Sequence, residues 1–143
     1  MANFLRTCTP EGDWRSLRFT NPDSVVWLDG QIYKIQDTIG VVIVAAAWDS
    51  HGCADTLDVD PGAEGVMIYH AEKILLPKAC GSGGSVFLVG QKVYWSGVGG
   101  DPVTPTYQSG FYWIGVCVHP ASIDDCQVKT DLKGDKASLT EPL

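Results

Sequence analysis

The sequence has 143 residues, of which 45% are hydrophobic and 19% charged, and its formal net charge is −7 at pH 7. A chain of this length fits one domain, because it can bury most of its unfolded surface around a single core. Its ten Lys and Arg residues are scattered and form no basic stripe that could follow a phosphate backbone. We therefore expect no nucleic-acid partner.

The sequence also argues against a membrane location. Its longest apolar run, residues 39–48, is about half as long as a membrane-spanning helix. The first residues lack the basic start and the apolar stretch of a secretory signal. We therefore expect the chain to fold in the cytosol.

Cysteine usage points in the same direction. The chain has five cysteines, an odd number with irregular spacing: Cys8, Cys53, Cys80, Cys117 and Cys126. Such a set favours free thiols in a reducing compartment over a disulfide framework. The sequence therefore predicts free thiols.

Short runs rich in Val, Ile, Tyr and Trp alternate along the chain with Gly, Pro, Asp and Ser clusters, and no window keeps helical spacing over several turns. This pattern predicts an all-β domain. The candidate strands are residues 15–19, 24–28, 31–35, 39–46, 65–70, 73–76, 86–89, 92–95, 111–119 and 126–132.

Two of these strands differ in their pattern. Residues 126–132 alternate cleanly, which predicts one buried and one wet face. Residues 111–118 are apolar at both parities, so both faces should be covered, and a subunit interface is one way to cover them. Gly115, inside this run, indicates a bulge or a close backbone approach.

The ends of the chain differ from the middle. We assign residues 1–14 to an N-terminal arm that orders on a partner, residues 15–132 to a single β domain, and residues 133–143 to a solvated tail.

The glycine cluster Gly81 to Gly84 could suggest a phosphate loop or a nucleophilic serine. A phosphate loop needs a Lys at a fixed offset and a following helix, and a nucleophile elbow needs Gly-x-Ser-x-Gly before a helix. Here a predicted strand follows, and neither pattern is present. We interpret the cluster as a connection between strands.

Weaker chemical signals remain. His51 with Cys53, and Cys117 with His119, have a spacing that could supply metal ligands or a catalytic pair on a strand. The acidic residues 55–64 do not match a calcium-binding loop. We therefore expect no catalytic residue, no metal and no cofactor.

The five tryptophans leave a sugar-binding platform as an alternative.

Several motifs, taken in order, resemble one protein family: the small capsid cement, or head decoration, proteins of tailed bacteriophages. The resemblance covers nearly the whole chain, and two segments, 48–62 and 107–113, depart from the family pattern. The motifs are Asp29-Gly30-Gln31, Thr38-Ile39-Gly40-Val41, Leu76-Pro77-Lys78, Val89-Gly90-Gln91-Lys92-Val93-Tyr94-Trp95, Ile114-Gly115-Val116 and Val128-Lys129-Thr130-Asp131-Leu132.

The resemblance implies a small β-barrel or β-sandwich that forms a homotrimer and binds the major capsid protein on the outside of an icosahedral head. It implies a non-enzymatic virion protein made in the cytoplasm of a bacterial host. A carbohydrate-binding β module on a phage surface or tail is the alternative, and a thiol or metal enzyme is a third hypothesis. The expected interface residues are Phe4, Leu5, Arg6, Trp14, Tyr112 and Trp113.

Overall fold

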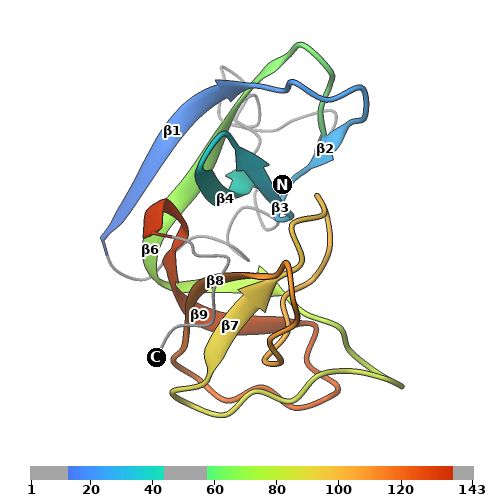
Figure 1. The fold of residues 1–143 in the computed structure, drawn as a ribbon, viewed down its shortest axis with the longest axis vertical. Coiled ribbons are helices and arrows are strands. Elements are labelled where there is room, and N and C mark those ends of the chain that lie inside the picture. Colours follow the sequence, from blue (N-terminus) through green and yellow to red (C-terminus); the bar gives the residue numbers. More distant parts are fainter. Residues whose placement is uncertain (1–12, 44–57, 137–143) are drawn as a thin grey trace, which may run out of the picture.

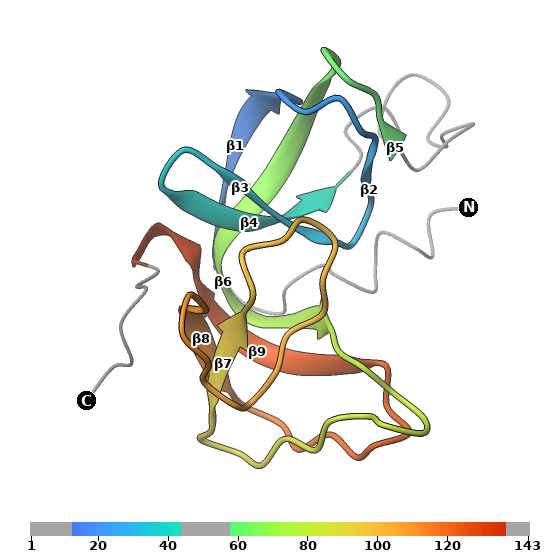
Figure 2. The ribbon, with the colours of Figure 1, turned by 45° about the vertical axis from the view of Figure 1, so that its right-hand side comes forward.

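The computed structural model describes residues 13–43 and 58–136, and these residues form an all-β fold (Figures 1 and 2), as predicted. The strands are β1 (Trp14–Thr20), β2 (Trp27–Leu28), β3 (Ile32–Ile35), β4 (Thr38–Ile43), β5 (Asp58–Val59), β6 (Glu64–Pro77), β7 (Lys92–Trp95), β8 (Tyr112–Cys117) and β9 (Gln127–Lys133). A short 3-10 helix, η2 (Gly134–Lys136), follows β9. The described residues contain no helix with the length and apolar character that a membrane crossing requires.

One antiparallel sheet forms most of the fold. Its strands follow the order β3-β4-β6-β9-β8-β7, and β1 pairs with the opposite edge of β6. The sheet curls into a half-barrel around the long strand β6, which runs through both halves of the molecule (Figure 1). The first half of β6 pairs with β1 and β4, and its second half pairs with β9.

Strand β6 corresponds to two predicted strands, 65–70 and 73–76. They form one strand that is interrupted by a β-bulge at the polar pair Glu72 and Lys73, where the register with β9 shifts between Ala71 and Ile74. Lys73 adopts a left-handed backbone conformation, with a φ angle of 55°. The bulge breaks the two-residue alternation, which explains why the sequence suggested a gap.

Two apolar cores lie on the two faces of the sheet. The larger fills the curve between the strands and includes Ile39, Trp95 and Ile114. The smaller lies on the other face, under the two-stranded ribbon of β2 and β5. There the ring of Trp27 stacks on Tyr33, with ring centroids 4.4 Å apart. The sequence did not predict β5, which has only two residues.

Strand β8 lies between β7 and β9, and its backbone is irregular. The register with β7 shifts where Tyr94 pairs with Trp113 and Val93 with Gly115. Consequently Ile114 and Cys117 both reach the larger core, although three positions separate them. The bulge accounts in part for the apolar residues at both parities, without a subunit interface. A Cβ atom on Gly115 would lie 2.2 Å from the carbonyl oxygen of Asp131, so the predicted bulge and close approach are both present.

The sheet extends beyond two predicted boundaries. Trp14, assigned to the arm, begins β1, and Lys133, assigned to the tail, pairs with His70. Gly134 packs so closely on β4 that a Cβ atom there would lie 1.6 Å from the carbonyl oxygen of Ile39. Residues 133–136 are therefore part of the fold.

Candidate functional site

Two loops lie together at the lower end of the molecule in Figures 1 and 2. One joins β6 to β7 (residues 78–91) and the other joins β8 to β9 (residues 118–126); we call them the stapled loops. Their backbones pair directly: Phe87 and Ala121 exchange two hydrogen bonds of 3.0 Å. The amide of Gly81 also donates to the carbonyl of Ile123 at 2.7 Å.

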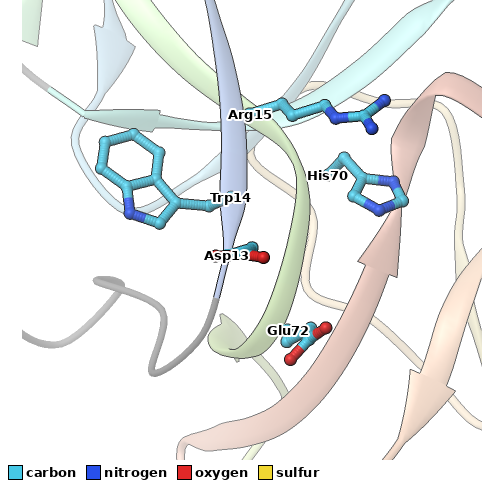
Figure 3. Close-up of a pocket in the computed structure, with 5 residues that line it drawn as sticks. All are labelled: Asp13, Trp14, Arg15, His70 and Glu72. Atoms are coloured by element: carbon cyan, nitrogen blue, oxygen red, sulfur yellow. The ribbon is translucent and has the colours of Figure 1, made fainter.

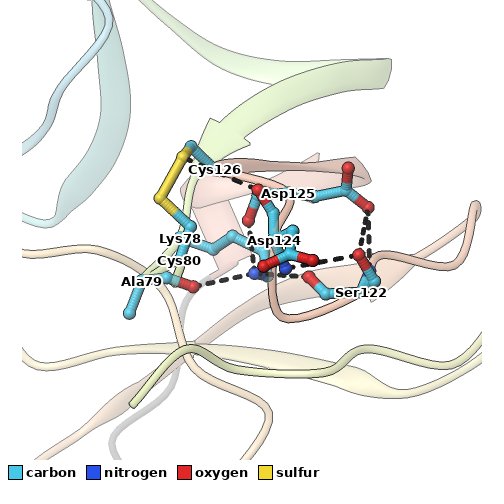
Figure 4. Close-up of a disulfide and its surroundings, with 7 residues drawn as sticks. All are labelled: Lys78, Ala79, Cys80, Ser122, Asp124, Asp125 and Cys126. Atoms are coloured by element: carbon cyan, nitrogen blue, oxygen red, sulfur yellow. Dashed lines mark hydrogen bonds between the residues drawn. A yellow bond between two sulfur atoms is a disulfide. The ribbon is translucent and has the colours of Figure 1, made fainter. Parts of the chain in front are cut away.

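A disulfide joins the stapled loops (Figure 4). It links Cys80 to Cys126, which are 46 positions apart in the sequence. The neighbouring strands bring them together, because Pro77 at the end of β6 pairs with Gln127 at the start of β9. This relationship belongs to the strand order, which the spacing of cysteines in the sequence does not reveal.

The prediction of free thiols is therefore wrong for Cys80 and Cys126. Cys117 is free, as predicted, and it is buried in the larger core. Cys8 and Cys53 lie outside the described residues.

Lys78 lies at the junction of the stapled loops, and its side chain is buried (Figure 4). Its ammonium donates to the carbonyl oxygens of Ala79 at 2.7 Å, Ser122 at 2.9 Å and Asp125 at 2.5 Å. A buried ammonium is costly unless its donors are satisfied, and these acceptors match its three N–H groups. Lys78 thus fixes the loop from Ser122 to Asp125 around its own side chain. In the sequence, Lys78 is distinguished only as part of the motif Leu76-Pro77-Lys78.

The glycine cluster connects β6 to β7, as predicted. Gly81 and Gly83 have φ angles of 77° and 81°, which favour glycine. At Gly84 a Cβ atom would lie 2.6 Å from the carbonyl oxygen of Ile123. The glycines therefore let the two loops approach closely, and no helix follows them.

Apolar side chains project from the stapled loops into solvent. The predicted strand 86–89 does not form: Phe87 is fully buried and makes only the bridge to Ala121, while its neighbours are exposed. We call the exposed set the apolar tip: Val86 (49% exposed), Leu88 (61%), Val89 (64%) and Ile123 (45%).

Three of the predicted interface residues, Trp14, Tyr112 and Trp113, are described by the structure, and they lie on β1 and β8. Trp14 is 41% exposed at the start of β1, which pairs only with β6 in the described part of the chain. Tyr112 and Trp113 are half-buried on β8, and the ring centroids of Tyr112 and Trp95 are 6.1 Å apart. The others, Phe4, Leu5 and Arg6, lie outside the described residues. The interface therefore remains a prediction.

A pocket of about 370 Å³ lies beside β1 and β6, lined by Asp13, Trp14, Arg15, His70 and Glu72 (Figure 3). The Trp14 ring projects from one side of β1, whereas Arg15 and His70 lie on the other side. His70 contacts the carboxylate of Asp135 at 3.4 Å, and these two side chains are both part-exposed. The pocket is polar and carries charges of both signs.

Cys117 and His119 meet through the backbone. The Cys117 thiol donates to the backbone carbonyl of His119 at 3.0 Å. Burial raises the pKa of the Cys117 thiol, and a raised pKa disfavours the reactive thiolate. Within residues 13–43 and 58–136, no three His, Cys, Asp or Glu side chains are grouped to hold a metal ion. His51 and Cys53 lie outside these ranges.

Comparisons with known proteins identify no relative: no family model, no curated protein and no solved structure matches the chain.

Proposed function

We propose that this chain is a non-enzymatic virion protein that binds the outside of an assembled phage head and stabilises it. The observation that carries the proposal is that four of the six resembling segments fall on neighbouring strands of one sheet, β6-β9-β8-β7. These segments are Leu76-Pro77-Lys78 at the end of β6, Val89 to Trp95 leading into β7, Ile114-Gly115-Val116 in β8 and Val128 to Leu132 in β9.

The roles of individual motif residues support this proposal. Lys78 binds carbonyl groups of the stapled loops, and Gly90 has a φ angle of 90° in the turn before β7. Gly115 leaves room for the backbone of β9. All three shape the backbone. A resemblance carried by such residues fits a protein that acts as a rigid building block.

The stabilising mechanism would be linked binding. A protein that binds only the assembled shell stabilises it by RT ln(1 + [L]/Kd), about 2.7 kcal/mol per site when its concentration is 100 times Kd. Assembly as a homotrimer would add avidity, because three copies engage together. The partner in this proposal is the major capsid protein, and the chain would be made in the bacterial cytoplasm.

The experiment that tests the proposal uses expanded heads of the encoding phage, assembled without this protein. Adding the purified chain should give saturable binding at symmetric sites and raise the temperature at which the heads disassemble. Light scattering of the free chain tests the trimer. A chain that does not bind these heads at micromolar concentration would contradict the proposal.

One observation favours the alternative, a carbohydrate-binding module. An exposed Trp14 stands next to a pocket that carries Arg15, His70 and Glu72, and sugars are commonly held by an aromatic ring with polar neighbours. The indole projects from the opposite side of β1 to Arg15 and His70 (Figure 3), which weakens this alternative. Retention on a glycan array that is lost in Trp14→Ala would support it.

A further inference from the structure

We propose that the apolar tip is the surface that docks on the head, in a groove of the shell that is apolar at its centre and basic at its rim. This inference rests on the proposed function, because it names which part of the chain meets that partner. It concerns residues that the expected interface did not include.

The side chains of the apolar tip are exposed. Leu88 and Val89 are the two most exposed large apolar side chains of the described residues, at 61% and 64%. They are neighbours in the sequence, Val86 is two positions from Leu88, and Ile123 is exposed on the adjoining stapled loop. Scattered apolar residues are ordinary on a surface, whereas a concentration of them on adjoining loops indicates an interaction site.

The loops that carry the apolar tip are held in place by several contacts. A disulfide, the buried ammonium of Lys78 and the backbone bridge between Phe87 and Ala121 all hold the loops that carry the tip. The amide of Leu88 also donates to the side chain of Gln91 at 2.6 Å, closing the turn that presents Val89. Loops that are ordered before binding lose less entropy when they bind.

The shape of the apolar tip is convex. Phe87 points into the core, so the flanking Val86 and Leu88 point outward from an extended backbone. Val89 sits at a turn, where Gln91 donates its amide to the carbonyl of Leu88 at 3.1 Å. These side chains project as knobs. A fitting partner must therefore supply the groove, which favours a large protein surface over a small ligand.

The charges of the stapled loops favour a partner of the opposite sign. The stapled loops contain three charged residues, of which Lys78 is buried and Asp124 and Asp125 are exposed. The exposed charge beside Ile123 is therefore negative, on a chain whose net charge is −7. Two copies meeting tip to tip would bring these carboxylates together, which is unfavourable. The charge favours a basic rim on a different protein.

The test is to measure the affinity of the chain for heads of the encoding phage that lack it. In the variant Leu88→Asp/Val89→Asp, affinity should fall by at least about 30-fold, because charge is introduced at the buried centre of the contact. Asp124→Lys should weaken binding about tenfold at low salt and less at high salt. Thermal unfolding of each variant shows that the fold is retained.

Matched controls are available elsewhere on the surface. Val98 and Val25 are 60% and 59% exposed, close to the exposures of Leu88 and Val89. Val98 lies in the loop between β7 and β8, where the amide of Gly100 donates to Ile32 of β3. Val98→Asp and Val25→Asp should bind the heads within about twofold of the wild type.

The outcomes separate the two proposals. If the wild-type chain does not bind, the proposed function fails and the tip inference falls with it. If the wild type binds and Leu88→Asp/Val89→Asp binds equally well, only the tip inference is overturned. A Val98→Asp or Val25→Asp variant that loses binding while the tip variant keeps it also overturns the inference. The inference is also overturned if the molar mass of a free tip variant differs from that of the free wild type, because the tip would then join copies of this chain.

Discussion

The ammonium of Lys78 lies 2.9 Å from the carbonyl oxygen of Ser122, a residue 44 positions away in the sequence. This contact joins the end of β6 to the loop before β9, beside the disulfide of Cys80 and Cys126. A single buried charge thus sets the conformation of a loop whose exposed face we propose to dock on a partner.

Lys78→Met should lower the free energy of unfolding by about 2–4 kcal/mol. The methionine fills a similar volume, but three part-buried carbonyl groups lose their donor. Urea unfolding followed by tryptophan fluorescence measures this change. Lys133→Met, at a half-buried lysine of β9, is the control and should cost less than about 1 kcal/mol. Equal effects of the two changes would show that the carbonyl contacts contribute little.

Reduction of the disulfide should destabilise the protein by about 2–4 kcal/mol. The bond closes a loop between residues 46 positions apart, and it limits the freedom of the unfolded chain. Unfolding of the wild type with and without a reductant measures the difference, and Cys80→Ser/Cys126→Ser should match the reduced wild type. Peptide mapping under non-reducing conditions should recover the two cysteines in one linked pair. An unfolding midpoint that does not respond to the reductant would count against the bond.

Much of the fold could be predicted from the sequence. The alternating residues 126–132 predicted β9, and the segment 92–95 predicted β7. Both predictions are correct because strand periodicity is a local property of the sequence. By contrast, the run 86–89 looked like a strand and is not one, since only Phe87 finds a partner. Whether an apolar run forms a strand depends on whether another segment pairs with it.

The candidate site was harder to predict. Cys80 and Cys126 meet only because β6 and β9 are neighbours, and Lys78 is buried only because the loop from Ser122 to Asp125 closes over it. Both facts depend on strand order, which a single sequence does not encode locally. Gly115 was the exception, since a glycine inside an apolar strand already signals a close backbone approach.

Gly115→Ala should destabilise the protein by more than about 2 kcal/mol or prevent folding. The added methyl group would lie 2.2 Å from the carbonyl oxygen of Asp131, so β8 and β9 would have to separate. Gly83→Asn is the control: its φ angle is 81° and the space around it is open, and asparagine tolerates that conformation better than most residues. Thermal unfolding should place the control within about 1 kcal/mol of the wild type. A well-folded Gly115→Ala protein of unchanged stability would refute the close approach of the strands.

Stability should fall at alkaline pH in a way that depends on Cys117. Burial raises the pKa of this thiol in the folded state above that in the unfolded chain, so the unfolded state loses its proton first. The contribution of the neutral thiol is therefore complete below the ordinary thiol pKa and is lost as the pH rises toward the raised value. The measurement is the unfolding midpoint between pH 7 and 10 for the wild type and for Cys117→Ala, both with the disulfide intact. The difference in stability between the two should shrink as the pH rises, and native Cys117 should react with iodoacetamide only on unfolding. A constant difference across this range, or rapid alkylation of the native protein, would mean that the thiol is accessible and ionises normally.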